Sequence, residues 1–211
     1  MSNDCGALHE ILNEGLRFQY PFDTTDMPLN GLYVLFEDGE EGHGRNRIVR
    51  VGTHTGPCRL QKRLSDHFIK EHKDRSIFRK NIGRAILSQI HDPFMHLWEQ
   101  DRTTRAARQE PLNPDDTHRL RAVESMVSAV LRQRFSFVLI RAEEKVTRLR
   151  WESQLIATVS LCSGCKPSPQ WLGQYSPVNK IRESGLWLVK GLYGQPLNHE
   201  DLTQIDQHLA R

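Results

Sequence analysis

One stretch of the sequence combines side chains that could bind and cleave a phosphate ester. Arg59, Arg63 and His67 are spaced four residues apart, so they share one face if the stretch is helical. A guanidinium can bind a phosphate through two parallel hydrogen bonds, and a neighbouring imidazole can exchange a proton with a phosphate-bound water. The same spacing is also typical of a solvated basic helix, so it indicates phosphate chemistry only together with other residues.

A glutamate falls within an apolar helical face later in the chain. Residues 143–161 have helical periodicity, with Leu149, Ile156 and Val159 on one face and Glu152 among them. A carboxylate that points inward is unfavourable unless a metal ion, an arginine or backbone N–H groups stabilise it. Glu152 is therefore a candidate site residue. The alternative is that it lies at the edge of the face and reaches water.

Tyr33 is a third candidate, although a strand tyrosine alone is weak evidence. Along a strand, Tyr33 and Leu35 would point to one side and Leu32 and Val34 to the other. A strand tyrosine usually packs in the core with its hydroxyl at the rim. Tyr33 therefore gains meaning only from the residues around it.

Three β-rich segments predict the sheet that would position these residues. Residues 31–36 and 47–52 flank a polar loop with several glycines, which predicts a hairpin, and residues 135–141 predict a third strand. We therefore expect an α/β (α+β) fold with a small, three-stranded, mostly antiparallel sheet flanked by helices. The apolar periodicity predicts helices over residues 7–17, 58–72, 76–90, 118–133, 143–161 and 198–211, with Ser76, Asp116-Thr117 and Asn198 as caps.

The composition is that of a globular protein. The 211 residues are 37% hydrophobic and 26% charged, which excludes a disordered chain. No apolar run reaches the roughly 18 residues that a membrane helix needs, and the N-terminal residues lack the pattern of a secretory signal. Four cysteines are too few for a disulfide scaffold. We expect a cytoplasmic protein with no membrane partner.

Charge is unevenly distributed along the chain. Residues 1–44 contain nine acidic side chains and one arginine, whereas residues 45–84 contain twelve basic and three acidic side chains. A segment this basic favours a polyanionic partner. The acidic segment could bind a protein partner or screen the basic face, which leaves an adaptor protein as one alternative.

The order of the candidate residues resembles the GIY-YIG nuclease superfamily, in particular a bacterial subfamily of uncharacterised proteins. Gly31-Leu32-Tyr33 matches the Gly-Ile-Tyr motif, and Arg50-Val51-Gly52 stands in the place of Tyr-Ile-Gly. Arg63, His67 and Glu152 match the later motif positions. Each motif is weak alone, whereas the ordered set on suitable elements is fairly specific.

The resemblance covers roughly residues 28–160 and implies how the chain is divided. It implies an acidic lead-in over residues 1–27 and a nuclease domain over residues 28–160 that carries an insertion at 90–134. Residues 161–211 would form a C-terminal extension packed on the same domain.

The resemblance also implies hydrolysis of a DNA phosphodiester bond with one divalent metal ion, Mg²⁺ or Mn²⁺. Glu152 would hold the metal and Arg63 would neutralise charge on the phosphate. Tyr33, with His54 or His67, would orient or deprotonate the attacking water. The DNA, duplex or branched, would lie along the basic segment, where the expected backbone contacts are Arg59, Lys62, Arg79 and Lys80.

Two departures from the family pattern keep an alternative open. Arg50 stands where the family has its second tyrosine, and Thr53 stands where a lysine often follows, with His54 as a substitute. Arg50 and Arg63 would place cations near Tyr33. The alternative is a catalytically weak or inert nucleic-acid-binding module on the same fold.

Cys162 and Cys165 form a C-x-x-C pair near the C-terminus. A structural zinc ion would need further ligands, and no spacing selects them from Cys58 and the histidines at 67, 72, 199 and 208. Two free cysteines in a loop are the simpler expectation. The nearby Trp171 and Trp187 are expected to pack on the core rather than to stack on bases.

Overall fold

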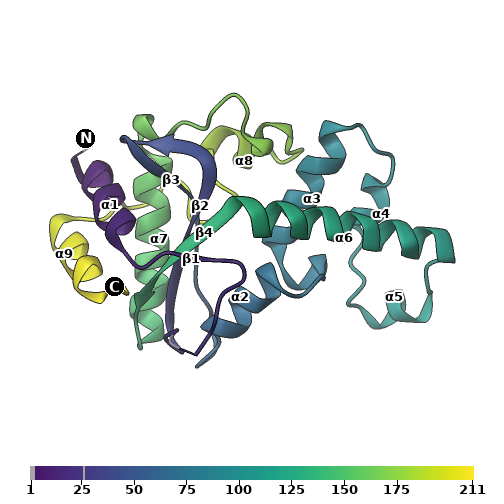
Figure 1. Cartoon of the computed structure of the whole chain (residues 1–211), viewed down its shortest axis with the longest axis horizontal. Coiled ribbons are helices and arrows are strands. Elements are labelled where there is room, and N and C mark those ends of the chain that lie inside the picture. Colours follow the sequence, from purple (N-terminus) through teal and green to yellow (C-terminus); the bar gives the residue numbers. More distant parts are fainter. Residues whose placement is uncertain (1–2, 26) are drawn as a thin grey trace.

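The computed structural model describes residues 3–25 and 27–211. Its centre is an antiparallel sheet of four strands in the order β1-β4-β2-β3 (Figure 1). The sheet and its flanking helices confirm the predicted fold class, and β1 is a two-residue addition at one edge. The strands are β1 (Phe18–Gln19), β2 (Gly31–Gly42), β3 (Arg45–Gly52) and β4 (Phe135–Arg141).

β2 and β3 form the predicted hairpin. The turn between them places His43 and Gly44 in the left-handed region, with φ of 54° and 69°, as two-residue hairpin turns require. β2 also pairs with β4, from Gly31 opposite Arg141 to Glu37 opposite Phe135. β2 is therefore held by a neighbour on each side, which fixes the position of the side chains that it carries.

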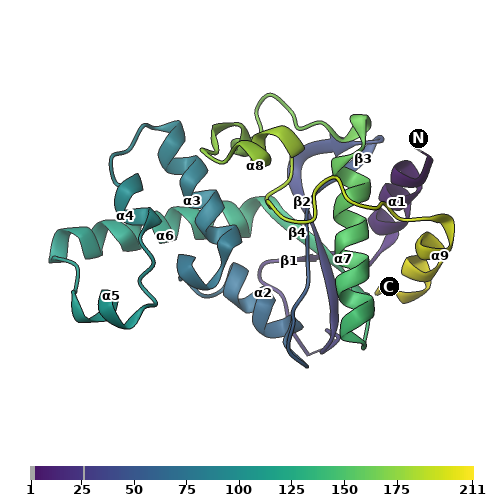
Figure 2. The same cartoon turned by 180° about the vertical axis from the view of Figure 1, so that it is seen from behind.

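Helices cover both faces of this sheet (Figures 1 and 2). None of the helices in the described part of the chain is long and apolar enough to cross a membrane. The helices are α1 (Asn3–Glu14), α2 (Leu60–Phe68), α3 (Ile77–Gln89), α4 (Met95–Glu99), α5 (Arg105–Gln109), α6 (Pro114–Arg134), α7 (Lys145–Ser160), α8 (Asn179–Ser184) and α9 (His199–His208). Short 3-10 turns are η1 (Lys73–Arg75), η2 (Ser163–Cys165) and η3 (Leu172–Tyr175).

The alternation of side chains along β2 divides the core in two, as predicted. Tyr33 and Leu35 pack into one cluster with apolar residues of α2, α3 and α6. Leu32 and Val34 pack into the other cluster with residues of α1, α7 and α9. α2 and α7, which carry most of the predicted site residues, therefore approach the sheet from opposite faces.

Helix starts follow the predicted caps in two of three cases. Ser76 and Asn198 cap α3 and α9 through side-chain hydrogen bonds. α6 begins at Pro114, earlier than predicted, because Asn113 rather than Asp116 is the cap. Proline suits this first helical position because its missing N–H would have no helical partner there.

The acidic N-terminal segment is part of the core rather than a free arm. Leu8 and Leu12 of α1 are fully buried in the cluster that includes α7 and α9, and α1 and α9 lie side by side in both views (Figures 1 and 2). A separate acidic lead-in that binds a protein partner is therefore not supported for residues 3–25.

The C-terminal extension packs on the central strand through two tryptophans. The Nε1 atoms of Trp171 and Trp187 both donate to Glu37 Oε2, at 2.8 and 2.9 Å. Both rings are fully buried, which confirms their predicted packing role. Burial raises the pKa of Glu37, and the two indole N–H groups and Arg134 oppose that rise.

Arg79 joins α3 to α6 through a buried ion pair. Its Nη2 lies 2.7 Å from Glu124 Oε2, and its Nη1 donates to the carbonyl of His67 at 3.0 Å. Arg79 is 0% exposed, so the expectation that it contacts DNA is not met. The sequence placed Arg79 in the basic segment but could not show that α6, from the insertion, covers it.

Replacing Arg79 by alanine should destabilise the fold by about 3–5 kcal/mol, because Glu124 would remain buried without its cation. The matched control is Arg211→Ala, which breaks the exposed pair with Asp206 and should change the unfolding free energy by about 1 kcal/mol or less. Urea denaturation measures both. An Arg79→Ala variant of unchanged stability but weaker DNA binding would reverse the assignment.

Candidate active site

Tyr33 and His67 form a buried hydrogen-bonded pair between β2 and α2. The Tyr33 hydroxyl lies 2.8 Å from His67 Nε2, and His67 Nδ1 lies 2.7 Å from the Ser76 hydroxyl. Tyr33 and His67 are 1% and 0% exposed. The sequence placed Tyr33 and His67 in one site; it identified Ser76 only as a helix cap. Ser76 has both functions, since its hydroxyl also accepts from the backbone of Arg79.

Gly52 makes room for the Tyr33 ring, and Gly31 makes room for the neighbouring strand β4. A Cβ on Gly52 would lie 2.2 Å from the Tyr33 hydroxyl oxygen, and a Cβ on Gly31 would lie 2.3 Å from the carbonyl oxygen of Ile140. Neither position can carry a side chain without displacing its neighbour. The tyrosine ring is thus seated directly against the last residue of β3.

His67 is held in its neutral form. Its pKa is lowered well below the ordinary value, first by burial and then by Arg63, Arg50 and Arg79. A neutral imidazole has one N–H donor and one acceptor nitrogen. If Nδ1–H donates to Ser76, Nε2 is free to accept the Tyr33 proton; the opposite tautomer reverses both bonds.

Glu152 of α7 points at the same end of β3 from the other face of the sheet. Its Oε1 accepts from the backbone N–H of Thr53 at 3.1 Å. Burial raises the pKa of Glu152, and the Thr53 hydrogen bond, Arg50 and Arg63 oppose that rise. Glu152 is half-buried, so it is neither in the core nor free in solvent. Of the apolar face predicted around it, Ile156 and Val159 are buried, whereas Leu149 is 38% exposed.

Glu152 and Arg50 both line a cavity of about 690 Å³. Arg50 donates from Nη1 to the carbonyl of Trp187, and its guanidinium lies 5.0 Å from the centre of the Phe78 ring. Its Nε is buried without a hydrogen-bond partner in the described structure. Lys190 lines the same cavity. No motif in the sequence pointed to Lys190, because it follows the loop that the fold brings back to the sheet.

Arg63 and the loop after β3 line a second cavity of about 310 Å³. Thr53 and Arg59 are among its lining residues, so the two cavities adjoin at the end of β3. Arg63 is half-buried and donates to the carbonyl of Arg75 at 3.3 Å, a long bond at an exposed site. The guanidinium therefore keeps donors for another acceptor.

His54 holds the loop in place with both ring nitrogens. Its Nδ1 lies 2.6 Å from the carbonyl of Gly56, and the backbone N–H of Gly31 donates to its Nε2 at 3.3 Å. This arrangement puts the proton on Nδ1 and occupies the acceptor nitrogen. The pKa of His54 is lowered by burial, so the ring is neutral. His54 thus positions the motif glycine and has no free nitrogen to activate a water.

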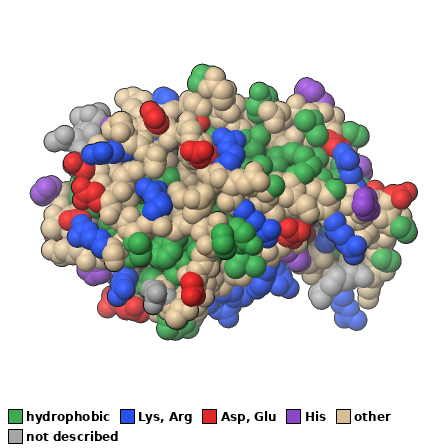
Figure 3. All heavy atoms as spheres, viewed as in Figure 1, with side chains coloured by type: hydrophobic (Ala, Val, Ile, Leu, Met, Phe, Trp, Pro, Cys, Tyr) green, Lys and Arg blue, Asp and Glu red, His purple; other side chains and the backbone are tan. Residues whose placement is uncertain are grey.

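Some of the predicted DNA contacts are exposed, whereas others form hydrogen bonds or ion pairs within the fold. Arg59 and Lys62 are exposed beside the second cavity, although Lys62 also pairs with Asp66 at 2.7 Å. Figure 3 shows Lys and Arg side chains gathered along the lower edge of the molecule, where α2 lies in Figure 1. Lys80 is only 12% exposed and donates to the carbonyl of Glu99 at 2.8 Å, so it is tied to the fold.

The donor set at Glu152 fits a hard divalent cation. Glu152 is the one carboxylate among the residues that line the larger cavity, and its second oxygen accepts no hydrogen bond from the described residues. Mg²⁺ typically keeps several waters and binds through one or two carboxylates. Because burial is the main cause of the raised pKa of Glu152, a bound cation would stabilise the charged form of this carboxylate.

The hairpin, the buried Tyr33–His67 pair and the facing glutamate come together on one α/β domain with a four-stranded sheet. A family model described as GIY-YIG domain matches residues 4–211, and the chain therefore belongs to the GIY-YIG domain family. Membership implies a nuclease-type function in general terms. Neither the curated proteins nor the solved structures that were compared contain a match.

Gly52→Ala should destabilise the protein by about 1–3 kcal/mol, because the added methyl group overlaps the Tyr33 hydroxyl. The control is Gly194→Ala, whose nearest neighbour would be 3.8 Å away and whose effect should stay within about 0.5 kcal/mol. Chemical denaturation compares the two. Equal stability of both variants would mean that the tyrosine is not seated against β3.

The buried, neutral His67 should make stability depend on pH. Below about pH 6.5 the unfolded state binds a proton on this histidine and the folded state does not, so the unfolding free energy falls as pH falls, by up to about 1.4 kcal/mol per pH unit. His67→Gln should remove this contribution. Denaturation at pH 7.5, 6.5 and 5.5 for both proteins isolates it, and parallel curves would contradict the assignment.

Proposed function

We propose that the chain is a metal-dependent endonuclease that hydrolyses DNA phosphodiester bonds at the end of β3. The proposal rests on one observation: a tyrosine, a glutamate and an arginine all approach Gly52 and Thr53 at the end of β3. The Tyr33 hydroxyl lies against Gly52, and Glu152 accepts from the N–H of Thr53. Arg63 lines the cavity to which Thr53 also contributes.

Each group has a role in the proposed reaction. Glu152 would hold a Mg²⁺ or Mn²⁺ ion, which when bound would polarise the phosphate and stabilise its developing charge. Arg63 would donate to a phosphate oxygen, since the hydrogen bond that it donates among the described residues is long, at 3.3 Å. Tyr33 would orient the attacking water or take its proton.

His67 would complete the proton path. For Tyr33 to accept a proton, its own must leave, and His67 Nε2 is 2.8 Å from the hydroxyl oxygen. The neutral imidazole has a lone pair on Nε2 for this proton, although the lowered pKa makes the ring a weaker base than a free histidine. Ser76, at Nδ1, would set the tautomer in which Nε2 is the acceptor.

DNA would approach along α2. Arg59 and Lys62 are exposed on this helix beside Arg63, and such contacts to a phosphate backbone make binding strongly salt-dependent. Arg79 and Lys80 are not part of this surface, because both are engaged within the fold.

The second candidate is an inert nucleic-acid-binding module. It is favoured by Arg50, which stands in the place of the family's second tyrosine and has one donor engaged by the carbonyl of Trp187. Glu152 and Arg63 favour the enzyme, since a binding module needs no half-buried carboxylate in a basic surface.

Glu152→Gln should reduce nicking of supercoiled plasmid by about 100-fold or more in Mg²⁺, because the amide keeps the shape and loses the charge that would hold the metal. The control is Glu183→Gln, the same change at an exposed position on α8, which should cleave like the wild type. A chelator should abolish cleavage by the wild type and by Glu183→Gln.

Binding to duplex DNA across a salt series decides between the two candidates. Cleavage lost in Glu152→Gln, with salt-dependent binding retained, supports the nuclease. Salt-dependent binding without cleavage in any metal supports the inert module, and absence of both overturns the DNA partner.

A further inference from the structure

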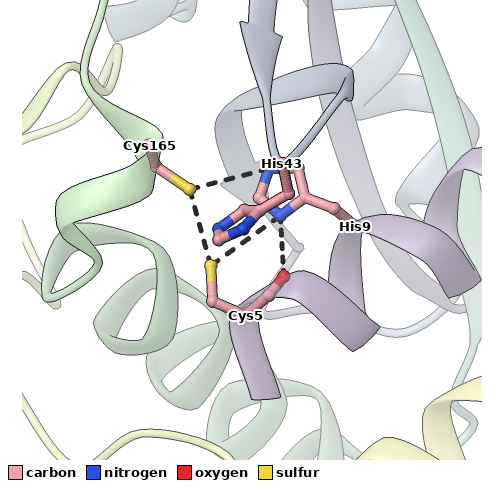
Figure 4. A group of neighbouring side chains, drawn as sticks. All are labelled: Cys5, His9, His43 and Cys165. Atoms are coloured by element: carbon pink, nitrogen blue, oxygen red, sulfur yellow. Dashed lines mark hydrogen bonds between the residues drawn. The ribbon is translucent and has the colours of Figure 1, made fainter. Parts of the chain in front are cut away.

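A cluster of cysteine and histidine side chains lies outside the candidate active site. Cys5 and His9 come from α1, His43 from the turn between β2 and β3, and Cys165 from η2 (Figure 4). One ligand atom from each of these four residues lies within 4.8 Å of the other three. Three segments that are far apart in the sequence therefore converge on one point.

The distances within the cluster match the edges of a metal tetrahedron. With metal–sulfur bonds of about 2.3 Å and metal–nitrogen bonds of about 2.0–2.1 Å, a zinc tetrahedron has sulfur–sulfur and sulfur–nitrogen edges of about 3.5–3.8 Å. Cys5 Sγ is 3.5 Å from Cys165 Sγ. Cys165 Sγ is 3.8 Å from His9 Nε2. Both of these distances fall within the expected range of edges.

His9 is oriented as metal-binding histidines are. Its Nδ1 lies 2.9 Å from the carbonyl oxygen of Cys5, to which it can donate, and this leaves Nε2 directed toward Cys165. A hydrogen bond from one ring nitrogen to a backbone carbonyl commonly fixes the tautomer of a ligating histidine. The backbone N–H of Ile48 also approaches Nε2 at 3.3 Å, a long contact that a metal ion would replace.

His43 is placed in the cluster by an unusual backbone and by a glycine. Its φ of 54° lies in the left-handed region, where few residues other than glycine are found. A Cβ on Gly164 would lie 3.0 Å from His43 Cε1, and a Cβ on Gly6 would lie 3.6 Å from its Nδ1. The absence of a side chain at Gly164 therefore makes room for the imidazole, whereas Gly6 lies at an ordinary contact distance from it.

Burial closes the cluster on one side. Cys5, His9 and Cys165 are 3%, 0% and 3% exposed, whereas His43 is exposed and forms the outer wall. Structural zinc sites are closed in this way, with four protein ligands and no position for substrate. Thiolates and imidazoles together select zinc over Mg²⁺, which prefers oxygen.

We propose that Cys5, His9, His43 and Cys165 bind a structural zinc ion that fastens α1 and η2 to the tip of the β2–β3 hairpin. The site is separate from Glu152. His43 precedes β3 and Thr53 follows it, and the eight residues of this strand span on the order of 25 Å at about 3.3 Å per residue.

The C-x-x-C pair contributes differently from the sequence expectation. Cys165 is buried in the cluster, but its partners are residues that the sequence did not select, and Cys58 is exposed elsewhere, near Asn30. Cys162 lies 3.2 Å from His43 Nε2, at the outside of the cluster. We assign Cys162 to the surroundings of the ion and not to its ligands.

Metal analysis of the full-length protein tests the proposal without any activity assay. The protein, expressed with zinc and purified without chelator, should contain about one zinc ion per chain by mass spectrometry. Cys5→Ser and Cys165→Ser should lose it, whereas Cys58→Ser, a matched change at an exposed cysteine, and Cys162→Ser should retain it. Loss of the metal in Cys162→Ser would overturn the proposed ligand set.

Wild-type measurements keep the proposal testable if the ligand variants fail to fold. Replacing zinc by Co²⁺ should give the absorption of a tetrahedral cobalt–thiolate centre, and chelator should remove it and lower the melting temperature reversibly. A metal-free protein with four free thiols would overturn the site. So would two fewer thiols under non-reducing conditions, which would reveal a Cys5–Cys165 disulfide. Glu152→Gln should retain its zinc, which separates this test from that of the nuclease.

Discussion

The close approach of the Tyr33 phenol to the backbone of Gly52 is the contact on which the arrangement of the site depends. This contact requires a residue without a side chain at the end of β3 and His67 on α2 to bind the hydroxyl. It also requires that β3 and β4 pair with β2 on either side, which fixes the strand that carries the ring. Because the next residue, Thr53, donates its N–H to Glu152, the same strand end positions the phenol and the carboxylate from opposite faces of the sheet. A one-residue change of register in β3 would separate them.

Local sequence patterns predicted the elements of the site better than the partners of its residues. The hairpin, the alternation along β2 and the caps Ser76 and Asn198 are short-range properties, and the structure confirms them. The burial of Arg79 and the convergence of Cys5 with Cys165 depend on segments 45 and 160 residues away. Residues this far apart in the sequence meet only in the folded chain, so the periodicity of a single sequence cannot predict such pairs.

The two candidate metal sites differ in the chemistry of their donors. Glu152 offers a carboxylate oxygen at a cavity that Arg50 also lines, whereas the cysteine and histidine cluster offers sulfur and nitrogen and is mostly buried. Hard cations such as Mg²⁺ prefer the first set and zinc prefers the second. The chain thus separates the two kinds of donor by the length of β3, which limits competition between ions.

The contact between Trp187 and Arg50 links local unfolding of the C-terminal extension to the hydrogen-bond donors available in the cavity. Arg50 donates to the backbone carbonyl of Trp187, and the Trp187 ring also binds Glu37. If this segment frays, the arginine regains a donor at the cavity that Glu152 lines. An anion that binds Arg50 in place of the carbonyl therefore favours the frayed state, and by reciprocity the frayed state binds that anion more tightly. The C-terminal extension therefore does more than cover the sheet, because its Trp187 carbonyl competes with an anion for Arg50.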